Sequence, residues 1–126
     1  MTREAVQTAG APAPIGPYSQ AIRSGKTLYC SGQVALDPAT GSLVGDDATT
    51  QAEQIMKNIG AVLREAGYDY NDVIKTTIFL IDMNDFAAVN TVYGRFFDAS
   101  KPARSTVAVA GLPRGARVEI EVIARK

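Results

Sequence analysis

The sequence predicts an α+β domain in which a single sheet carries both helices on one face. Apolar residues at three- and four-residue intervals predict a long helix that ends near residue 66. Alternating apolar and charged residues predict a strand over residues 117–124. The predicted order is strand pair, helix, strand, helix, strand pair, and two helices are too few to cover both faces of such a sheet. We therefore expect one helix-covered face and one open face.

A β-hairpin is predicted near the N-terminus, after a proline-rich extended segment over residues 11–17. Its strands are residues 18–24 and 27–34, and Gly25 at the first loop position suits a type II′ turn. Alternation divides the second strand between the two faces of the sheet. The residues expected to face the helices are Leu28, Cys30, Gly32 and Val34, and those expected to face away are Tyr29, Ser31 and Gln33.

The first helix is predicted from an apolar stripe and from residues typical of helix ends. Thr50 and Glu53 can form a capping box, although Asp46 or Asp47 would start the helix a turn earlier, and Gly67 is a good stop. The stripe consists of Ala52, Ile55, Met56, Ile59, Val62, Leu63 and Ala66. A strand rich in β-branched residues follows over residues 73–81.

The second helix is predicted to begin after a cap at Asp82 or Asn84. Its apolar stripe consists of Phe86, Val89, Tyr93, Phe96 and Phe97. Residues 103–110 and 117–124 are the last two strands, and alternation again assigns their side chains to faces. Those expected to face the helices are Val107, Val109, Val118, Ile120 and Val122.

The open face of the sheet is predicted to combine polar and apolar groups. Tyr29, Ala108 and Ile123 make a fully solvated surface less favourable, so we expect a homo-oligomer built on that face. The polar residues expected there are Ser31, Gln33, Arg104, Thr106, Glu119 and Glu121.

Composition narrows the classes of function. The 126 residues, 46% of them hydrophobic, fit a single domain over residues 1–126. With no histidine and one cysteine, a Ser-His-Asp triad is excluded, and we expect neither a metal nor a cofactor. A formal net charge of zero argues against a nonspecific hold on nucleic acid. The N-terminus lacks the apolar region of a signal peptide, and no apolar run is long enough to span a membrane, which predicts a cytoplasmic protein.

Arg104 is the residue that most needs a partner, because a guanidinium is always charged and this one begins a strand-like segment. One interpretation is an ion pair with Glu119 or Glu121, which the spacing alone favours. The other is a fork of donors that binds the carboxylate of a small ligand.

Four further positions have both a structural and a functional interpretation. Asn90 lies beside the apolar stripe of the second helix, either half exposed or engaged in a hydrogen bond. Gly32, next to Ser31, permits either a bulge or the close approach of a ligand. Glu119 either joins two strands through a salt bridge or positions and deprotonates a water. Cys30 has no evident activating base and is interpreted as a small buried hydrophobe.

Short motifs run through nearly the whole chain, from Ala11 to Ala124. They are Ala11-Pro12 with Ile15-Gly16-Pro17-Tyr18-Ser19-Gln20-Ala21, then Ser31-Gly32-Gln33, Phe86-Ala87-Ala88-Val89-Asn90, Pro102-Ala103-Arg104-Ser105, and Leu112-Pro113 with Val118-Glu119-Ile120-Glu121. Each is short, but in register they are highly specific. Together they resemble the RidA family of enamine and imine deaminases.

The resemblance implies a chorismate-mutase-like subunit, a homotrimer and clefts between subunits. It implies hydrolysis of 2-aminoacrylate and 2-aminocrotonate, through their imine tautomers 2-iminopropanoate and 2-iminobutanoate, to 2-oxo acids and ammonia. By position, Arg104 would bind the substrate carboxylate and Glu119 would hold the attacking water. The other residues lining the cleft would be Tyr18, Ser31, Gly32, Asn90 and Thr106. The family often has a cysteine where this chain has Thr106, which argues against a thiol role and leaves carboxylate binding by the backbone amide intact.

Two other functions stay open on the sequence alone. A RidA-like homotrimer could bind a small metabolite without turnover or act in a chaperone-like way. Some relatives are associated with RNA cleavage or translation inhibition, but the neutral charge, the lack of histidine and the absence of an aromatic stacking platform argue against this role.

Overall fold

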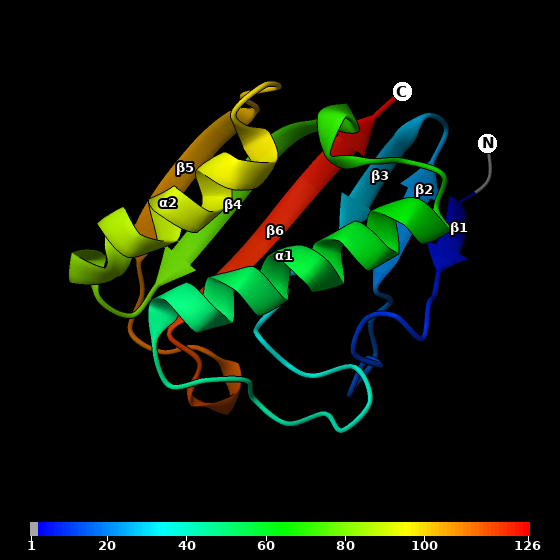
Figure 1. Cartoon of the computed structure of the whole chain (residues 1–126). Coiled ribbons are helices and arrows are strands. Elements are labelled where there is room, and N and C mark those ends of the chain that lie inside the picture. Colours follow the sequence, from blue (N-terminus) through cyan, green and yellow to red (C-terminus); the bar gives the residue numbers. More distant parts are fainter. Residues whose placement is uncertain (1–2) are drawn as a thin grey trace.

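Six strands form one mixed sheet in the computed structural model, which describes residues 3–126 (Figure 1). The strands are β1 Arg3–Val6, β2 Ala21–Ser24, β3 Thr27–Cys30, β4 Val73–Leu80, β5 Ala103–Ala108 and β6 Val118–Arg125. Their order across the sheet is β1-β2-β3-β6-β4-β5. β5 runs parallel to β4, whereas the other neighbouring strands are antiparallel.

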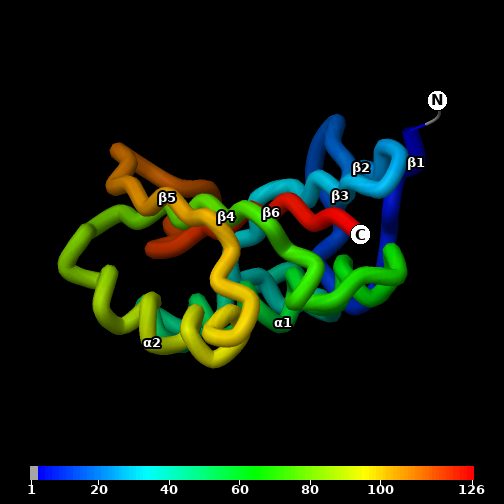
Figure 2. Tube along the Cα trace, turned by 90° about the horizontal axis from the view of Figure 1, so that it is seen from above, coloured from blue at the N-terminus to red at the C-terminus, as the bar shows by residue number. Residues whose placement is uncertain are grey.

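Both helices lie on the same face of the sheet, which confirms the predicted architecture (Figures 1 and 2). The helices are α1 Ala48–Glu65 and α2 Phe86–Phe97. Asp47 caps α1 by accepting a hydrogen bond of 2.7 Å from the backbone N–H of Thr50, so the helix starts at the earlier of the predicted positions. The carboxylate of Glu53 pairs with Arg95 of α2 at 2.9 Å instead of completing a capping box.

Short 3-10 turns occur at three of the connections. They are η1 Tyr70–Asp72, η2 Met83–Asp85 and η3 Pro113–Gly115. Asp82 accepts a hydrogen bond of 2.9 Å from the N–H of Asn84 and so caps η2, which leads directly into α2. The predicted cap at Asp82 is therefore confirmed, but it caps the 3-10 turn η2, and α2 itself begins at Phe86.

The strand arrangement differs from the prediction at both ends of the chain. The last two strands are not neighbours, because β4 lies between β5 and β6. β1 is absent from the prediction, since it has no apolar alternation and Val6 is its single buried residue. The predicted hairpin is confirmed, with Ser24 opposite Thr27 and Gly25 at a φ of 61°.

A one-residue bulge after β3 reverses the predicted orientation of the residues that follow it. Tyr29 lies opposite Ile123, whereas Gln33 lies opposite Ile120. Residues 30–32 therefore span the same distance as residues 121–122, and the alternation shifts by one position. Gln33, predicted to face away from the helices, is 8% exposed beside the buried Ile120. Gly32 is instead on the open face, against Glu119.

The edge strand β5 has the opposite orientation from the one predicted. Arg104 lies opposite Thr76 and Thr106 lies opposite Ile78, and both β4 residues are fully buried beneath the helices. Arg104 and Thr106 therefore point to the helix-covered face, whereas Val107 is 43% exposed on the open face. Alternation misassigns this strand because the open face also carries apolar side chains, so hydrophobicity does not distinguish the two faces.

The core lies between the sheet and the helices. Ile55 and Leu63 of α1 and Ile78 of β4 belong to one core cluster, and all three are fully buried. In β6 the alternation is as predicted, with buried Val118, Ile120 and Val122 beneath the helices. Within residues 3–126, neither helix combines the length and the apolar character that crossing a bilayer requires.

Candidate active site

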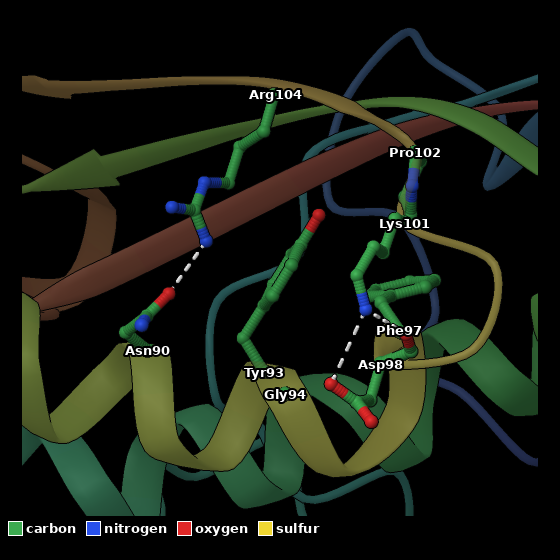
Figure 3. Close-up of a pocket in the computed structure, with 8 residues that line it drawn as sticks. All are labelled: Asn90, Tyr93, Gly94, Phe97, Asp98, Lys101, Pro102 and Arg104. Carbon is green, nitrogen blue, oxygen red and sulfur yellow. Dashed lines mark hydrogen bonds and ion pairs between the residues drawn. The ribbon is translucent and has the colours of Figure 1, made fainter.

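Arg104 lines a cavity between β5 and α2, on the helix-covered face (Figure 3). This Arg104 cavity has a volume of about 400 Å³. Nη1 of Arg104 donates a hydrogen bond of 2.6 Å to Oδ1 of Asn90. Asn90 thus has the hydrogen-bonding task that would explain an asparagine within a helix. The other lining residues are Tyr93, Gly94, Phe97, Asp98, Lys101 and Pro102.

Two aromatic rings of α2 lie against the guanidinium. Cζ of Arg104 is 4.9 Å from the ring centroid of Tyr93 and 5.4 Å from that of Phe86, within the range of a cation–π attraction. The hydroxyl groups of Tyr93 and Thr76 are hydrogen-bonded at 2.7 Å. Burial raises the pKa of Tyr93, so its hydroxyl remains protonated at neutral pH.

Arg104 forms no ion pair with a carboxylate in residues 3–126. Glu119 and Glu121 lie on the open face of β6, because the residues between and beside them are buried under the helices. Arg104 and Glu119 therefore lie on opposite faces of one subunit. The ion-pair interpretation of Arg104 is wrong, and so is the expectation that these two groups share a face. The positive charge of Arg104 is left available to an external anion.

A second cavity lies on the open face and contains Glu119. This Glu119 cavity has a volume of about 480 Å³. It brings Tyr18, Ser31 and Gly32 to the same place as Glu119, so four of the predicted site residues are together. Its other lining residues are mainly apolar, namely Ile15, Val34, Leu36, Pro113 and Arg114.

The predicted site is thus divided between the two cavities of one subunit. Arg104 and Asn90 line one, and Glu119 with its neighbours lines the other. Thr106 lines neither. Its hydroxyl oxygen is buried and has no hydrogen-bond partner among the described residues, so the side chain is not presented to either cavity.

The carboxylate of Glu119 is placed by a glycine and perturbed by its surroundings. A Cβ atom at Gly32 would overlap Oε2 of Glu119, so the bulge must have glycine for the carboxylate to lie there. Burial raises the pKa of Glu119, and the nearby charge of Glu121 raises it further. The hydroxyl of Ser31 is already engaged, since it donates a hydrogen bond of 2.6 Å to the carbonyl of Ser19.

Neither a thiol nor a metal cluster enters this arrangement. Burial raises the pKa of Cys30 to about 12, so the sulfur is a protonated thiol at neutral pH, in keeping with its interpretation as a buried hydrophobe. The described part of the chain contains no group of three histidine, cysteine, aspartate or glutamate residues that could hold a metal ion.

The aromatic neighbours of the Arg104 guanidinium are absent from the predicted site. Phe86 and Tyr93 are predicted only as part of the apolar stripe of the second helix. A signal exists, because Phe86 precedes Asn90 by four residues and Tyr93 follows it by three, which places all three on one side of a helix. Arg114, with a φ of 62°, is also missed, and nothing in its local sequence indicates that it lines the Glu119 cavity.

The fold and the two cavities define a small α+β protein with an uncompensated arginine on one face of its sheet and a desolvated glutamate on the other. The sequence model described as Endoribonuclease L-PSP matches residues 8–126. The chain is 53% identical over 122 residues to the 2-iminobutanoate/2-iminopropanoate deaminase of Mus musculus, which covers 97% of this chain and 90% of that one.

Solved structures agree with this likeness over almost the whole chain. A putative endoribonuclease from Thermotoga maritima matches with a TM-score of 0.96 and 46% identity, covering 98% of this chain and 97% of that one. E. coli TdcF with bound serine matches with a TM-score of 0.92 and 40% identity, covering 98% of each chain. The chain belongs to the RidA family.

Proposed function

We propose that this protein hydrolyses small 2-imino acids, such as 2-iminopropanoate and 2-iminobutanoate, to 2-oxo acids and ammonia. The observation that carries the proposal is the Arg104 guanidinium, which is held at the edge of a cavity without a carboxylate partner among the described residues. A guanidinium in this position is suited to bind a carboxylate through two parallel hydrogen bonds. The mouse relative, more than half identical, is named for the deamination of these two imines.

Hydrolysis of an imine mainly requires that the protein position the substrate and a water molecule. A protonated imine carbon is already electrophilic, so the site has to hold the carboxylate, orient the imine and place a water about 3 Å from the reacting carbon. In this proposal Arg104 holds the carboxylate and Glu119 holds the water and accepts one of its protons. Glu119 returns this proton to the amino group of the resulting aminoalcohol, and ammonia leaves as the hydroxyl gives its proton to solvent and becomes the carbonyl of the 2-oxo acid. Water is the sole co-reactant.

The division of the site between opposite faces supports a composite site between subunits. We propose a homotrimer in which the Arg104 cavity of one subunit meets the Glu119 cavity of its neighbour. The open face exposes large apolar side chains, with Tyr29 at 51% and Val107 at 43%, which favours its burial against another copy. In such an assembly Tyr18, Ser31 and Gly32 would line the cleft beside Glu119, and Thr106 would contribute its backbone amide near Arg104.

The test is release of ammonia and 2-oxo acid from an imine generated in the assay by an amino-acid oxidase acting on alanine. We expect the protein to shorten the lifetime of the imine at substoichiometric concentration. Binding of 2-oxobutanoate without any acceleration would contradict the proposal and indicate a metabolite-binding protein instead. Salt-dependent RNA binding, with no effect on the imine, would point to the activity that the description of the family model names.

A further inference from the structure

Tyr93 occupies the space directly against the Arg104 guanidinium. Its side chain rises from α2 toward the sheet, and Arg104 descends toward α2 beside it (Figure 3). The ring centroid is 4.9 Å from Cζ of Arg104, and the residue is 7% exposed. Tyr93 is therefore part of the core and, at the same time, one wall of the Arg104 cavity.

The orientation of this ring is fixed at both ends. Its backbone belongs to α2, and its hydroxyl is hydrogen-bonded at 2.7 Å to Thr76 of β4, which is fully buried. Phe97 packs against the ring with a centroid distance of 4.7 Å. A ring held in this way cannot tilt without breaking a buried hydrogen bond, which is costly in a low-dielectric interior.

The guanidinium is thereby restrained from two directions. Asn90 accepts a hydrogen bond from Nη1, and the face of Tyr93 attracts the delocalised charge. A guanidinium has five N–H donors, so these contacts leave most of them free for a ligand. Restraining a long side chain before binding reduces the entropy lost when the ligand arrives.

We infer that Tyr93, held by Thr76, is a positioning residue that orients Arg104 to receive the substrate carboxylate. The inference rests on the proposed function, because Tyr93 is assigned to orient the same Arg104 that the proposed function assigns to carboxylate binding. Because Tyr93 is inferred to act through Arg104, its loss should weaken binding of the carboxylate more than it slows the chemical step.

Three variants separate positioning from a merely structural role. Tyr93→Phe and Thr76→Val each leave one buried hydroxyl without its partner, and the double variant removes both. Because removing both partners of a buried hydrogen bond can be nearly neutral, the melting temperature of the double variant should return toward that of the parent protein. Tyr70→Phe is the control, since the Tyr70 hydroxyl donates a partly buried hydrogen bond of the same 2.7 Å length to the carbonyl of Met56 and makes no contact with Arg104 among those found in residues 3–126.

We expect the double variant to keep a KM raised about five-fold, with kcat within about two-fold, even though its melting temperature recovers. The Kd for 2-oxobutanoate, measured by calorimetry, should rise in parallel. Thr76→Ser with Tyr93 intact keeps a hydroxyl at position 76, so its KM and Kd should be close to those of the parent protein. Tyr70→Phe should also leave KM and Kd unchanged.

The inference is overturned if KM and Kd recover together with the melting temperature in the double variant, because Tyr93 would then act through stability alone. The Arg104→Lys variant distinguishes failure of the positioning role of Tyr93 from failure of the proposed function. If Arg104→Lys weakens 2-oxobutanoate binding and the Tyr93 variants do not, the positioning role fails and the carboxylate anchor stands. If Arg104→Lys has no effect, the proposed function fails, and the inference fails with it.

Discussion

The Arg104 cavity and the Glu119 cavity hold their charged groups in opposite ways. Arg104 is restrained by Asn90 and by the face of Tyr93, and its charge is permanent. Glu119 is partly desolvated beside Glu121, and its pKa is raised rather than matched by a counter-charge. The first arrangement suits binding, which needs a fixed charge in a fixed place. The second suits proton transfer, because a raised pKa makes the carboxylate a stronger base.

One subunit cannot bring Arg104 and Glu119 to the same substrate molecule. Arg104 points to the helix-covered face and Glu119 to the open face, so a molecule held by one cannot reach the other within the same subunit. In the proposed homotrimer, assembly would join the Arg104 cavity of one subunit to the Glu119 cavity of its neighbour.

The largest effect should follow removal of the binding charge. Arg104→Ala loses two charge-assisted hydrogen bonds to the substrate carboxylate, which we expect to lower kcat/KM for 2-iminopropanoate about 1,000-fold. Light scattering should give an unchanged assembly mass. Arg95→Ala removes the exposed partner of Glu53 from α2, the helix that also carries Asn90, so this variant is the matched control and should retain full activity. A fully active Arg104→Ala protein would contradict the assignment of Arg104 to binding of the substrate carboxylate.

The next effect concerns the Glu119 cavity. Glu119→Gln keeps the size of the side chain but cannot accept a proton, so we expect kcat to fall about 100-fold while the Kd for 2-oxobutanoate stays the same. Gly32→Ala should act in the same direction, because the new methyl group displaces the flexible end of Glu119 and not the backbone. Loss of 2-oxobutanoate binding in Glu119→Gln would contradict the assignment of binding and proton transfer to different cavities.

A smaller effect should appear in the pH dependence of the rate. In the proposed mechanism Glu119 accepts a proton as a carboxylate, so activity should rise with pH through the raised pKa of Glu119. Glu121→Gln removes the neighbouring negative charge, so the midpoint of this acid limb should move to lower pH. A rate profile from pH 4 to 8 on both proteins measures the shift. A midpoint that does not move would mean that Glu121 leaves the reactive carboxylate unaffected.

The smallest effect should be on stability. Folding raises the pKa of Glu119, so the folded state binds the proton more tightly than the unfolded state does. The free energy of unfolding therefore falls as pH rises from the usual glutamate range through the raised pKa, and Glu119→Gln removes this loss. Denaturant unfolding at acidic and neutral pH should give a variant that gains stability relative to the parent only at the higher pH. A gain of equal size at both pH values would argue against the shift.

Much of the fold follows from sequence patterns because local forces determine it. The stripe of α1, the cap at Asp47 and the hairpin at Gly25 each depend on neighbours within a few residues. The strand order and the parallel pairing of β4 with β5 depend on contacts between distant segments, which periodicity does not encode.

The candidate site was harder to predict because two local irregularities decide which way its residues point. A single inserted residue at Ser31 and Gly32 shifts the alternation, and the apolar open face makes the orientation of β5 ambiguous. The motifs therefore give the identity of Arg104 and Glu119 as candidates, while their separation onto two faces requires the three-dimensional structure. The pairing of Arg104 with Asn90 follows from neither residue alone.

The most direct test of the composite site mixes two inactive subunits. Arg104→Ala and Glu119→Gln proteins are coexpressed with different affinity tags, and assemblies carrying both tags are isolated. If each site takes Arg104 from one subunit and Glu119 from its neighbour, every homotrimer that carries both variants has one intact site, so about one third of the sites in the isolated assemblies are intact. The account predicts that mixed assemblies recover about this share of the activity. Mixed assemblies as inactive as either parent would contradict it, since both groups would then have to come from the same chain.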